Sequence, residues 1–200
     1  LRLNKAVDSP EIIRLIILGR RTRRTRRRGA AVVWRGDIRR CWMSARTVAW
    51  IGGGVPDRWV HNWADRGHVM CEASIITKKN RRLFSVASGL QVCALAQMSA
   101  AGNPLALGAK IADAMVSRAE ARLAAGLDPR DEDTWEVFVY RFQTMDGELT
   151  LTGRYVPRTI SLLELEFGKY VVPGVGVELR MFPIDEGIAQ VFAKADAEEM

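Results

Sequence analysis

The alternation of apolar and polar residues predicts a helix near the N-terminus. Residues 9–19 read Ser-Pro-Glu followed by a run rich in Ile and Leu that ends at Gly19. A Ser side chain caps the first amides of a helix, Pro suits its first position, and Gly commonly ends it. We therefore expect a helix here, then a short strand at residues 32–34 and a flexible turn at the three Gly residues 52–54.

The clearest helix pattern runs from Pro104 to about Ala125. We expect Asn103 to cap this helix, Pro104 to occupy its first position and Gly126 to end it. Apolar side chains recur at helical spacing, which predicts one buried face. They are Ile111, Met115, Ala119 and Leu123.

The remainder of the chain favours strands. Residues 135–142 and 148–156 flank Asp146-Gly147, a dipeptide typical of hairpin turns. A further strand is expected around residues 175–182, and an acidic helix over residues 184–199. These elements predict an α+β fold, in which a small basic N-terminal region packs with a C-terminal region of one helix and antiparallel strands.

The charges divide the chain into two regions. Residues 1–100 contain 20 Lys and Arg but only 6 Asp and Glu, a balance of +14, whereas residues 101–200 contain 10 and 17, a balance of −7. Five of the six Trp residues lie in the basic half. We therefore expect residues 1–100 to face nucleic acid and residues 101–200 to pack or to contact protein partners.

Composition narrows the class of protein. Hydrophobic residues make up 48% of the chain, which permits a packed core, and no apolar run reaches about 18 residues, so we expect no membrane span. The three cysteines do not describe a secreted disulfide scaffold. The N-terminal apolar stretch precedes a basic run instead of following it, so we expect no signal peptide and a cytoplasmic location.

The strongest candidate for nucleic-acid contact is an Arg run over residues 20–28. Seven of its nine residues are Arg and none is acidic. Guanidinium groups bind phosphate through two hydrogen bonds, and each neutralised phosphate releases counterions. The alternative is a solvated charge run or a localisation signal. The predicted contacts are Arg20, Arg21, Arg23, Arg24, Arg26, Arg27 and Arg28.

A second set of candidates lies between residues 58 and 82. Trp59 and Trp63 would share one face of a helix, flanked by Arg58 and Arg66, and an exposed indole can stack on an unpaired base. The alternative is that these Trp residues belong to the core. A further basic cluster follows, formed by Lys78, Lys79, Arg81 and Arg82.

Two tetrapeptides resemble zinc knuckles that have lost their second cysteine. They are residues 41–44, Cys-Trp-Met-Ser, and residues 71–74, Cys-Glu-Ala-Ser. Two intact Cys-x-x-Cys turns would indicate a four-thiolate zinc site, but a Ser hydroxyl is a poor ligand for zinc. Two interpretations stay open: a fold without metal, or a zinc ion held by Cys41, Cys71 and His68 with His61 or Asp65 as the fourth ligand. Cys93 is expected to be a buried, inert thiol.

The order of these motifs resembles a known family. The chain resembles the zinc-finger large-subunit protein of type IV CRISPR effector complexes in the order of five segments. They are the 9–19 helix, the basic stretch, residues 41–44, the Pro-Asp-Arg-Trp segment 56–59, and residues 69–74 followed by further arginines. The resemblance is confined to the first ninety residues, and both second cysteines depart from the family pattern.

That resemblance implies a non-catalytic subunit of a ribonucleoprotein. Family members lie at the 5′ end of a guide RNA, help to recognise the motif beside the DNA target and contact other protein subunits. One alternative from another class is a viral or phage structural protein with an Arg-rich arm that binds the genome. A second is a nuclease of the His-Asn-His type, suggested by His61-Asn62 and His68, but this chain has too few His residues for both a zinc site and a catalytic centre. We expect no enzyme, and we expect the acidic cluster at residues 128–133 to be a capping loop.

Overall fold

The computed structural model describes residues 37–74, 81–145, 148–157 and 180–198. The predicted helix at 9–19, the predicted strand at 32–34, the Arg run and Lys78 and Lys79 lie outside these ranges. The α-helices are α2 (Ala45–Ile51), α3 (Asp57–Asp65), α4 (Val86–Ala100), α5 (Leu105–Ala124) and α7 (Ile184–Glu198), and the strands are β1 (Glu72–Ser74), β2 (Arg81–Leu83), β3 (Glu136–Met145), β4 (Glu148–Pro157) and β5 (Arg180–Phe182). The α+β prediction is confirmed.

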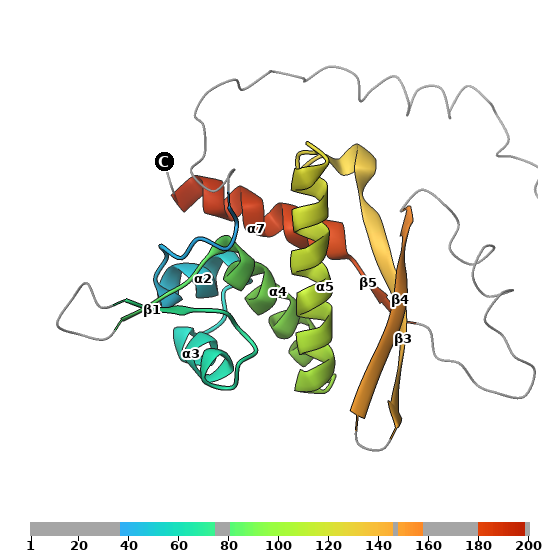
Figure 1. The fold of residues 1–200 in the computed structure, drawn as a ribbon, viewed down its shortest axis with the longest axis horizontal. Coiled ribbons are helices and arrows are strands. Elements are labelled where there is room, and N and C mark those ends of the chain that lie inside the picture. Colours follow the sequence, from blue (N-terminus) through green and yellow to red (C-terminus); the bar gives the residue numbers. More distant parts are fainter. Residues whose placement is uncertain (1–36, 75–80, 146–147, 158–179, 199–200) are drawn as a thin grey trace, which may run out of the picture. The chain divides into compact units, whose positions relative to one another are not determined.

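Helix α4 is the centre of the helical part, where it lies between α2 and α5 (Figure 1). The side chains of Ser85 and Ser88 cap its N-terminus reciprocally. Every residue from Val86 to Leu95 is buried, so this part of the helix is enclosed on all sides and shows no amphipathic period. For that reason the 3.6-residue pattern, which predicts α5, gave no signal for α4.

Glycines permit the helices to cross closely. A Cβ added at Gly89 of α4 would lie 2.6 Å from Cδ1 of Ile51 at the end of α2. A Cβ at Gly187 of α7 would lie 2.7 Å from Cε of Met115 on α5. A Cβ at Gly89 would also meet Cγ1 of Ile51 at 2.9 Å, so Ile51 would have to shift, whereas at Gly187 a shift of the flexible Met115 side chain would suffice.

Helix α5 follows its prediction with one correction. Ile111, Met115 and Ala119 are fully buried, and Gly126 has a positive φ of 72° just beyond the helix end. Asn103 was expected to cap the helix, but Pro104 occupies the cap position with ψ 142°, and the Asn103 side chain accepts a hydrogen bond from Arg180 instead. The extended ψ of Pro104 places the cap one residue later than predicted.

The larger sheet has the strand order β4-β3-β5 and is antiparallel throughout. Met145 pairs with Glu148, so only Asp146 and Gly147 connect β3 to β4, as the hairpin prediction required. One face packs on the helices: the Tyr155 hydroxyl donates to the Ala114 carbonyl of α5 at 3.3 Å, and Tyr140 lies against Met98 of α4. Helix α5 therefore lies between α4 and this sheet (Figure 1).

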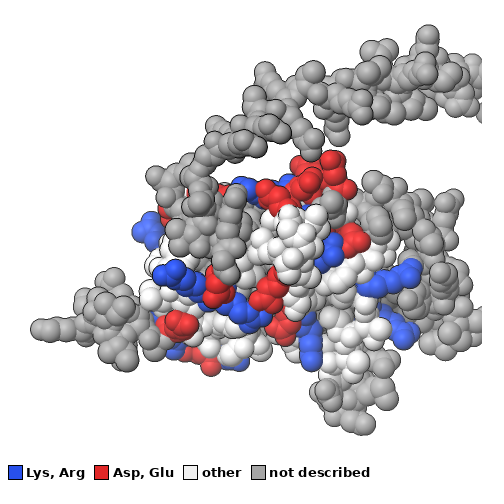
Figure 2. Space-filling model, turned by 45° about the horizontal axis from the view of Figure 1, so that its top comes forward, with Lys and Arg blue, Asp and Glu red and all other residues white. Residues whose placement is uncertain are grey.

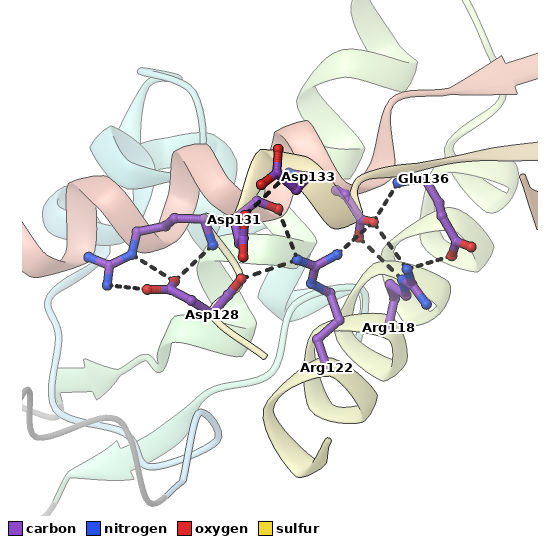
Figure 3. Close-up of polar contacts among 8 residues, drawn as sticks. Arg118, Arg122, Asp128, Asp131, Asp133 and Glu136 are labelled. Atoms are coloured by element: carbon purple, nitrogen blue, oxygen red, sulfur yellow. Dashed lines mark hydrogen bonds and ion pairs between the residues drawn. The ribbon is translucent and has the colours of Figure 1, made fainter. Parts of the chain in front are cut away.

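A buried polar network joins α5, α7 and β3 (Figure 3). The Asp185 carboxylate is inaccessible to solvent and accepts hydrogen bonds from Arg118, from Arg122 and from the Glu136 amide. Arg122 also donates to backbone carbonyls of the loop at residues 128–131. The acidic cluster at 128–133 is thus a capping loop, as predicted, in which the Asp131 carboxylate accepts from the Asp133 amide.

One hydrophobic core, which runs from Ile38 to Ala195, is shared by the described parts of both halves of the chain. The two halves therefore share one core and can differ only in the surfaces that they expose. The assignment of residues 1–100 to nucleic acid and of residues 101–200 to protein partners stays a prediction. None of the helices in the described ranges is long and apolar enough to cross a membrane.

Candidate nucleic-acid interface

Helix α3 presents one Trp to the core and another to solvent. Val60 and Trp63 are buried, with exposed fractions of 0% and 7%, whereas 40% of Trp59 is exposed. The two indoles meet edge to face with their ring centroids 5.7 Å apart. The stacking prediction therefore does not hold for Trp63, whose ring is enclosed by the core, while Trp59 rests on it as an exposed and supported aromatic surface.

Exposed cations flank Trp59 along the same helix. Arg58 directly precedes Trp59, and Arg66 follows the last turn of α3, seven residues beyond Trp59 and so on the same side. Both side chains are exposed, and neither forms an ion pair with any residue that the structure describes. Their charges are consequently available to an anion in solution.

The β1–β2 hairpin is tied to the same helix. Nη2 of Arg82 on β2 lies 2.5 Å from Oδ1 of Asp65, and Nη1 donates to the His61 carbonyl at 3.4 Å. The hydrogen bond with the Asp65 carboxylate raises the pKa of Arg82 above its ordinary value. The His61 ring lies edge to face on Phe84, 6.1 Å away. These contacts hold β2, and with it the paired strand β1, against α3.

The loop between α3 and β1 is fixed by buried polar groups of α4. The Met70 amide donates to Gln91 Oε1 at 2.8 Å, and Ser88 Oγ donates to the Met70 carbonyl at 2.7 Å. Gln91 and Ser88 are 5% and 0% exposed, so both hydrogen bonds are shielded from water. The chain just before β1 is therefore held firmly against α4.

The basic excess of the first half lies mostly outside the described residues. Of the 20 Lys and Arg residues in positions 1–100, 11 fall in residues 1–36 and two in residues 75–80. In the described part, Arg39 is neutralised by Glu120 on α5, with Nε and Oε1 2.5 Å apart. The face drawn in Figure 2 accordingly interleaves basic and acidic side chains and shows no continuous basic patch.

The predicted metal ligands come from several elements. Cys41 is half-buried, and burial, with Glu72 and Cys71 nearby, raises the pKa of its thiol. Ser44, which replaces the second cysteine of the first tetrapeptide, caps α2 by accepting from the Thr47 amide, and residues 72–74 of the second tetrapeptide form β1.

Within the described ranges, no group of three or more His, Cys, Asp or Glu side chains is arranged to hold a metal ion. The set of Cys41, Cys71 and His68 therefore stays a prediction, as does the choice between zinc and a metal-free fold. Cys93 is buried, as expected, and burial raises the pKa of its thiol to about 11.

Of the predicted contacts, Arg58 and Trp59 are exposed neighbours at the start of α3, and Arg82 is linked to the end of the same helix through Asp65. Arg82 forms an ion pair with Asp65, so its side chain holds the β1–β2 hairpin to α3. The Arg81 side chain is not described, and the remaining predicted contacts lie outside the described ranges. Sequence reasoning did not single out Trp50, which is 43% exposed at the end of α2; the signal that could have found it is Arg46, four residues earlier.

The sequence matches no protein-family model and no curated protein.

Proposed function

We propose that the protein binds nucleic acid as a non-catalytic subunit of a ribonucleoprotein. The observation that carries this proposal is the exposed indole of Trp59 on a helix with two exposed cations, Arg58 and Arg66, neither of which forms an ion pair with a residue in the described ranges. These three side chains project from a helix whose opposite face is anchored in the core by Val60 and Trp63. An aromatic ring beside phosphate-binding cations is the basic unit of a surface that binds nucleic acid.

The chemistry of each group supports the proposal. An indole face stacks on a base, which contributes about 1–3 kcal/mol, and Arg binds phosphate oxygens through two hydrogen bonds. Because Trp59 rests on the buried Trp63, little side-chain entropy is lost when a base stacks on it. The site selects no base sequence by itself, since phosphate and stacking contacts are shared by all nucleotides.

Basic residues elsewhere in the sequence would extend this surface. The β1–β2 hairpin, tied to α3 through Arg82 and Asp65, leads into the segment with Lys78 and Lys79. The Arg run at residues 20–28 supplies seven further cations without an acidic neighbour. Together they would add a strong and salt-sensitive electrostatic contribution to the stacking contact on α3.

The resemblance of residues 9–90 to the type IV CRISPR large subunit suggests guide RNA and target DNA as the ligands. The acidic half, with its balance of −7, would then contact other protein subunits. In this assignment the protein positions nucleic acid and carries out no reaction of its own.

A salt series on the full chain tests the interface on α3. Binding of labelled RNA and DNA would be measured for the wild type and for Arg58→Ala, Arg66→Ala and Trp59→Ala. We expect each Arg variant to lower the slope of log affinity against log salt by about 0.7–0.9, and Trp59→Ala to weaken binding without changing the slope. The control is Arg141→Ala, which removes an exposed cation of β3. An unchanged affinity in all three variants would disprove the assignment to α3.

A second experiment separates the arm from the helix and identifies the partners. Replacing Arg23, Arg24, Arg26, Arg27 and Arg28 by Ala should flatten the salt dependence more than either single variant of α3 does. The chain purified from its own cells should bring with it one defined small RNA and several other proteins. Self-assembly of the pure chain into closed particles would instead support the structural-protein alternative.

A further inference from the structure

We infer that Trp50, with Arg46 and Lys194 beside it, forms a second stacking site, and that the ligand of this protein is a single-stranded segment of nucleic acid lying across Trp50 and Trp59. This inference rests on the proposed function and narrows it, because it names the strandedness of the ligand and the residues of α2 and α7 that receive it.

Helix α2 directs Arg46 and Trp50 to the same side. They are four residues apart, so they lie one above the other on one helix face, and both are exposed. The other face of the helix is fully committed to the core through Val48 and Ile51, each with an exposed fraction of 0%. The helix that carries Trp50 is therefore held against the core, and 43% of the Trp50 surface is accessible.

Lys194 reaches this site from α7, 144 residues further along the chain. Its Nζ donates to the Trp50 carbonyl at 3.2 Å and lies 5.7 Å from the centroid of the indole. A cation at the end of α2 also interacts favourably with the helix dipole. The hydrogen bond to the backbone holds the ammonium group near the ring, where a phosphate that follows a stacked base would lie.

Trp50 and Trp59, the exposed Trp residues of the described ranges, have similar neighbours. Trp50 has Arg46 and Lys194 near it, and Trp59 has Arg58 and Arg66; none of these four cations forms an ion pair with a described residue. An apolar partner surface would not require cations around both rings, whereas a polyanion with flat bases fits both features. The charge around the indoles therefore identifies the occupant as nucleic acid.

We infer that the nucleic-acid ligand is single-stranded, because only an unpaired base exposes a face to an indole. In a duplex both faces of an internal base are covered by its neighbours, so an indole can stack only on an unpaired base. Nine residues separate Trp50 from Trp59, which limits their Cα separation to about 30 Å. One strand of about 16 nucleotides is comparable to the longer site sizes of proteins that bind single strands by stacking. It is therefore a suitable probe for both sites at once.

The test compares single strands with duplexes. Labelled 16-nucleotide DNA and RNA, each alone and annealed to its complement, would be titrated with the full-length wild type, Trp50→Ala, Trp50→Phe and Lys194→Gln. We expect Trp50→Ala to weaken binding to the single strands about 5- to 100-fold and to leave duplex binding unchanged. Trp50→Phe should recover most of the lost affinity, because it keeps an aromatic face. The DNA and RNA arms show which nucleic acid is preferred.

The control is Lys110→Gln, which removes an exposed cation of α5 that has no aromatic partner among the described residues. It should not discriminate single strands from duplexes. A single strand carrying 2-aminopurine gives a second readout, since stacking on Trp50 quenches its fluorescence, and this quenching should be lost in Trp50→Leu.

Equal losses for single strands and duplexes, or none, would overturn the inference. If the wild type binds nucleic acid and Trp59→Ala weakens binding while Trp50→Ala does not, the proposed function stands and the second site does not exist. If the wild type binds neither DNA nor RNA, the proposed function itself fails.

Discussion

Arg122 donates from Nη1 to Oδ2 of Asp185 at 3.0 Å, although the two residues are 63 positions apart and neither is more than 1% exposed. Arg118 adds two hydrogen bonds to the same carboxylate, and Glu136 adds its backbone amide. The buried negative charge is thus balanced by two guanidinium groups of α5 (Figure 3). This network fixes the start of α7 against α5 and the start of β3.

Removal of this carboxylate should destabilise the fold strongly. Asp185→Asn leaves the guanidinium of Arg122 buried without its counter-charge, so we expect the free energy of unfolding to fall by about 3–5 kcal/mol. Urea unfolding followed by circular dichroism measures the loss. The control, Asp113→Asn, makes the same chemical change at an exposed position of α5 and should alter stability by less than about 0.5 kcal/mol. Similar effects in both variants would contradict a structural role for the network.

Gly153 is required by the ring of Phe138. A Cβ at this position of β4 would lie 2.5 Å from Cζ of Phe138 and 2.8 Å from the Val139 carbonyl oxygen. We expect Gly153→Ala to lower the free energy of unfolding by about 1–3 kcal/mol through overpacking. Combining it with Phe138→Leu should give a smaller loss than the sum of the single variants, because the Leu side chain has no atom at the ring position. Additive losses in this double-mutant cycle would rule out the Phe138 ring as the cause and leave the contact with the Val139 carbonyl oxygen.

Substitution of Trp63 should mainly affect the stability of the fold, whereas substitution of Trp59 should mainly affect the binding of nucleic acid. Trp63→Ala empties a core position that is 7% exposed, and a loss of about 3–5 kcal/mol in unfolding free energy is expected. Trp59→Ala removes a ring that is 40% exposed, so we expect a small change in stability together with weaker binding of nucleic acid. Unfolding and binding measured on the same samples distinguish the two. The reverse pattern would place Trp63, and not Trp59, at the interface.

The Cys93 thiol should contribute a loss of stability at high pH. Its pKa is raised by burial from 9.0 to about 11, so between these values the unfolded chain loses the proton while the folded chain keeps it. Stability is therefore complete below pH 9 and falls as the pH rises towards 11, by about 2–3 kcal/mol at most.

Comparison of the wild type with Cys93→Ala isolates this effect from the titration of other groups. The stability difference between the two proteins should shift against the wild type by that amount between pH 8 and pH 11. Urea unfolding at both values measures it, and a difference independent of pH would show that Cys93 titrates normally.

Local patterns predicted the elements whose signals lie within a few residues of one another. Apolar spacing predicted α5, and the Asp146-Gly147 dipeptide predicted the β3–β4 hairpin, because periodicity and turn chemistry act over one or two turns of chain. Apolar spacing did not predict helix α4, because a helix buried on all sides carries no polar face. Asn103 failed as a cap because the partner of its side chain, Arg180, lies 77 residues away.

Local patterns and composition suffice for three features: the α+β class, the concentration of positive charge in residues 1–100, and a set of Trp and Arg residues as the candidate surface. The packing of the chain leaves Trp59 exposed and buries Trp63, and it adds Trp50 as a second exposed indole. It also pairs Arg82 and Arg122 with carboxylates, whereas Arg58 and Arg66 form no ion pair with any residue that the structure describes. The physical reason is that burial and ion pairing depend on segments brought together from distant positions, which composition and local spacing do not encode.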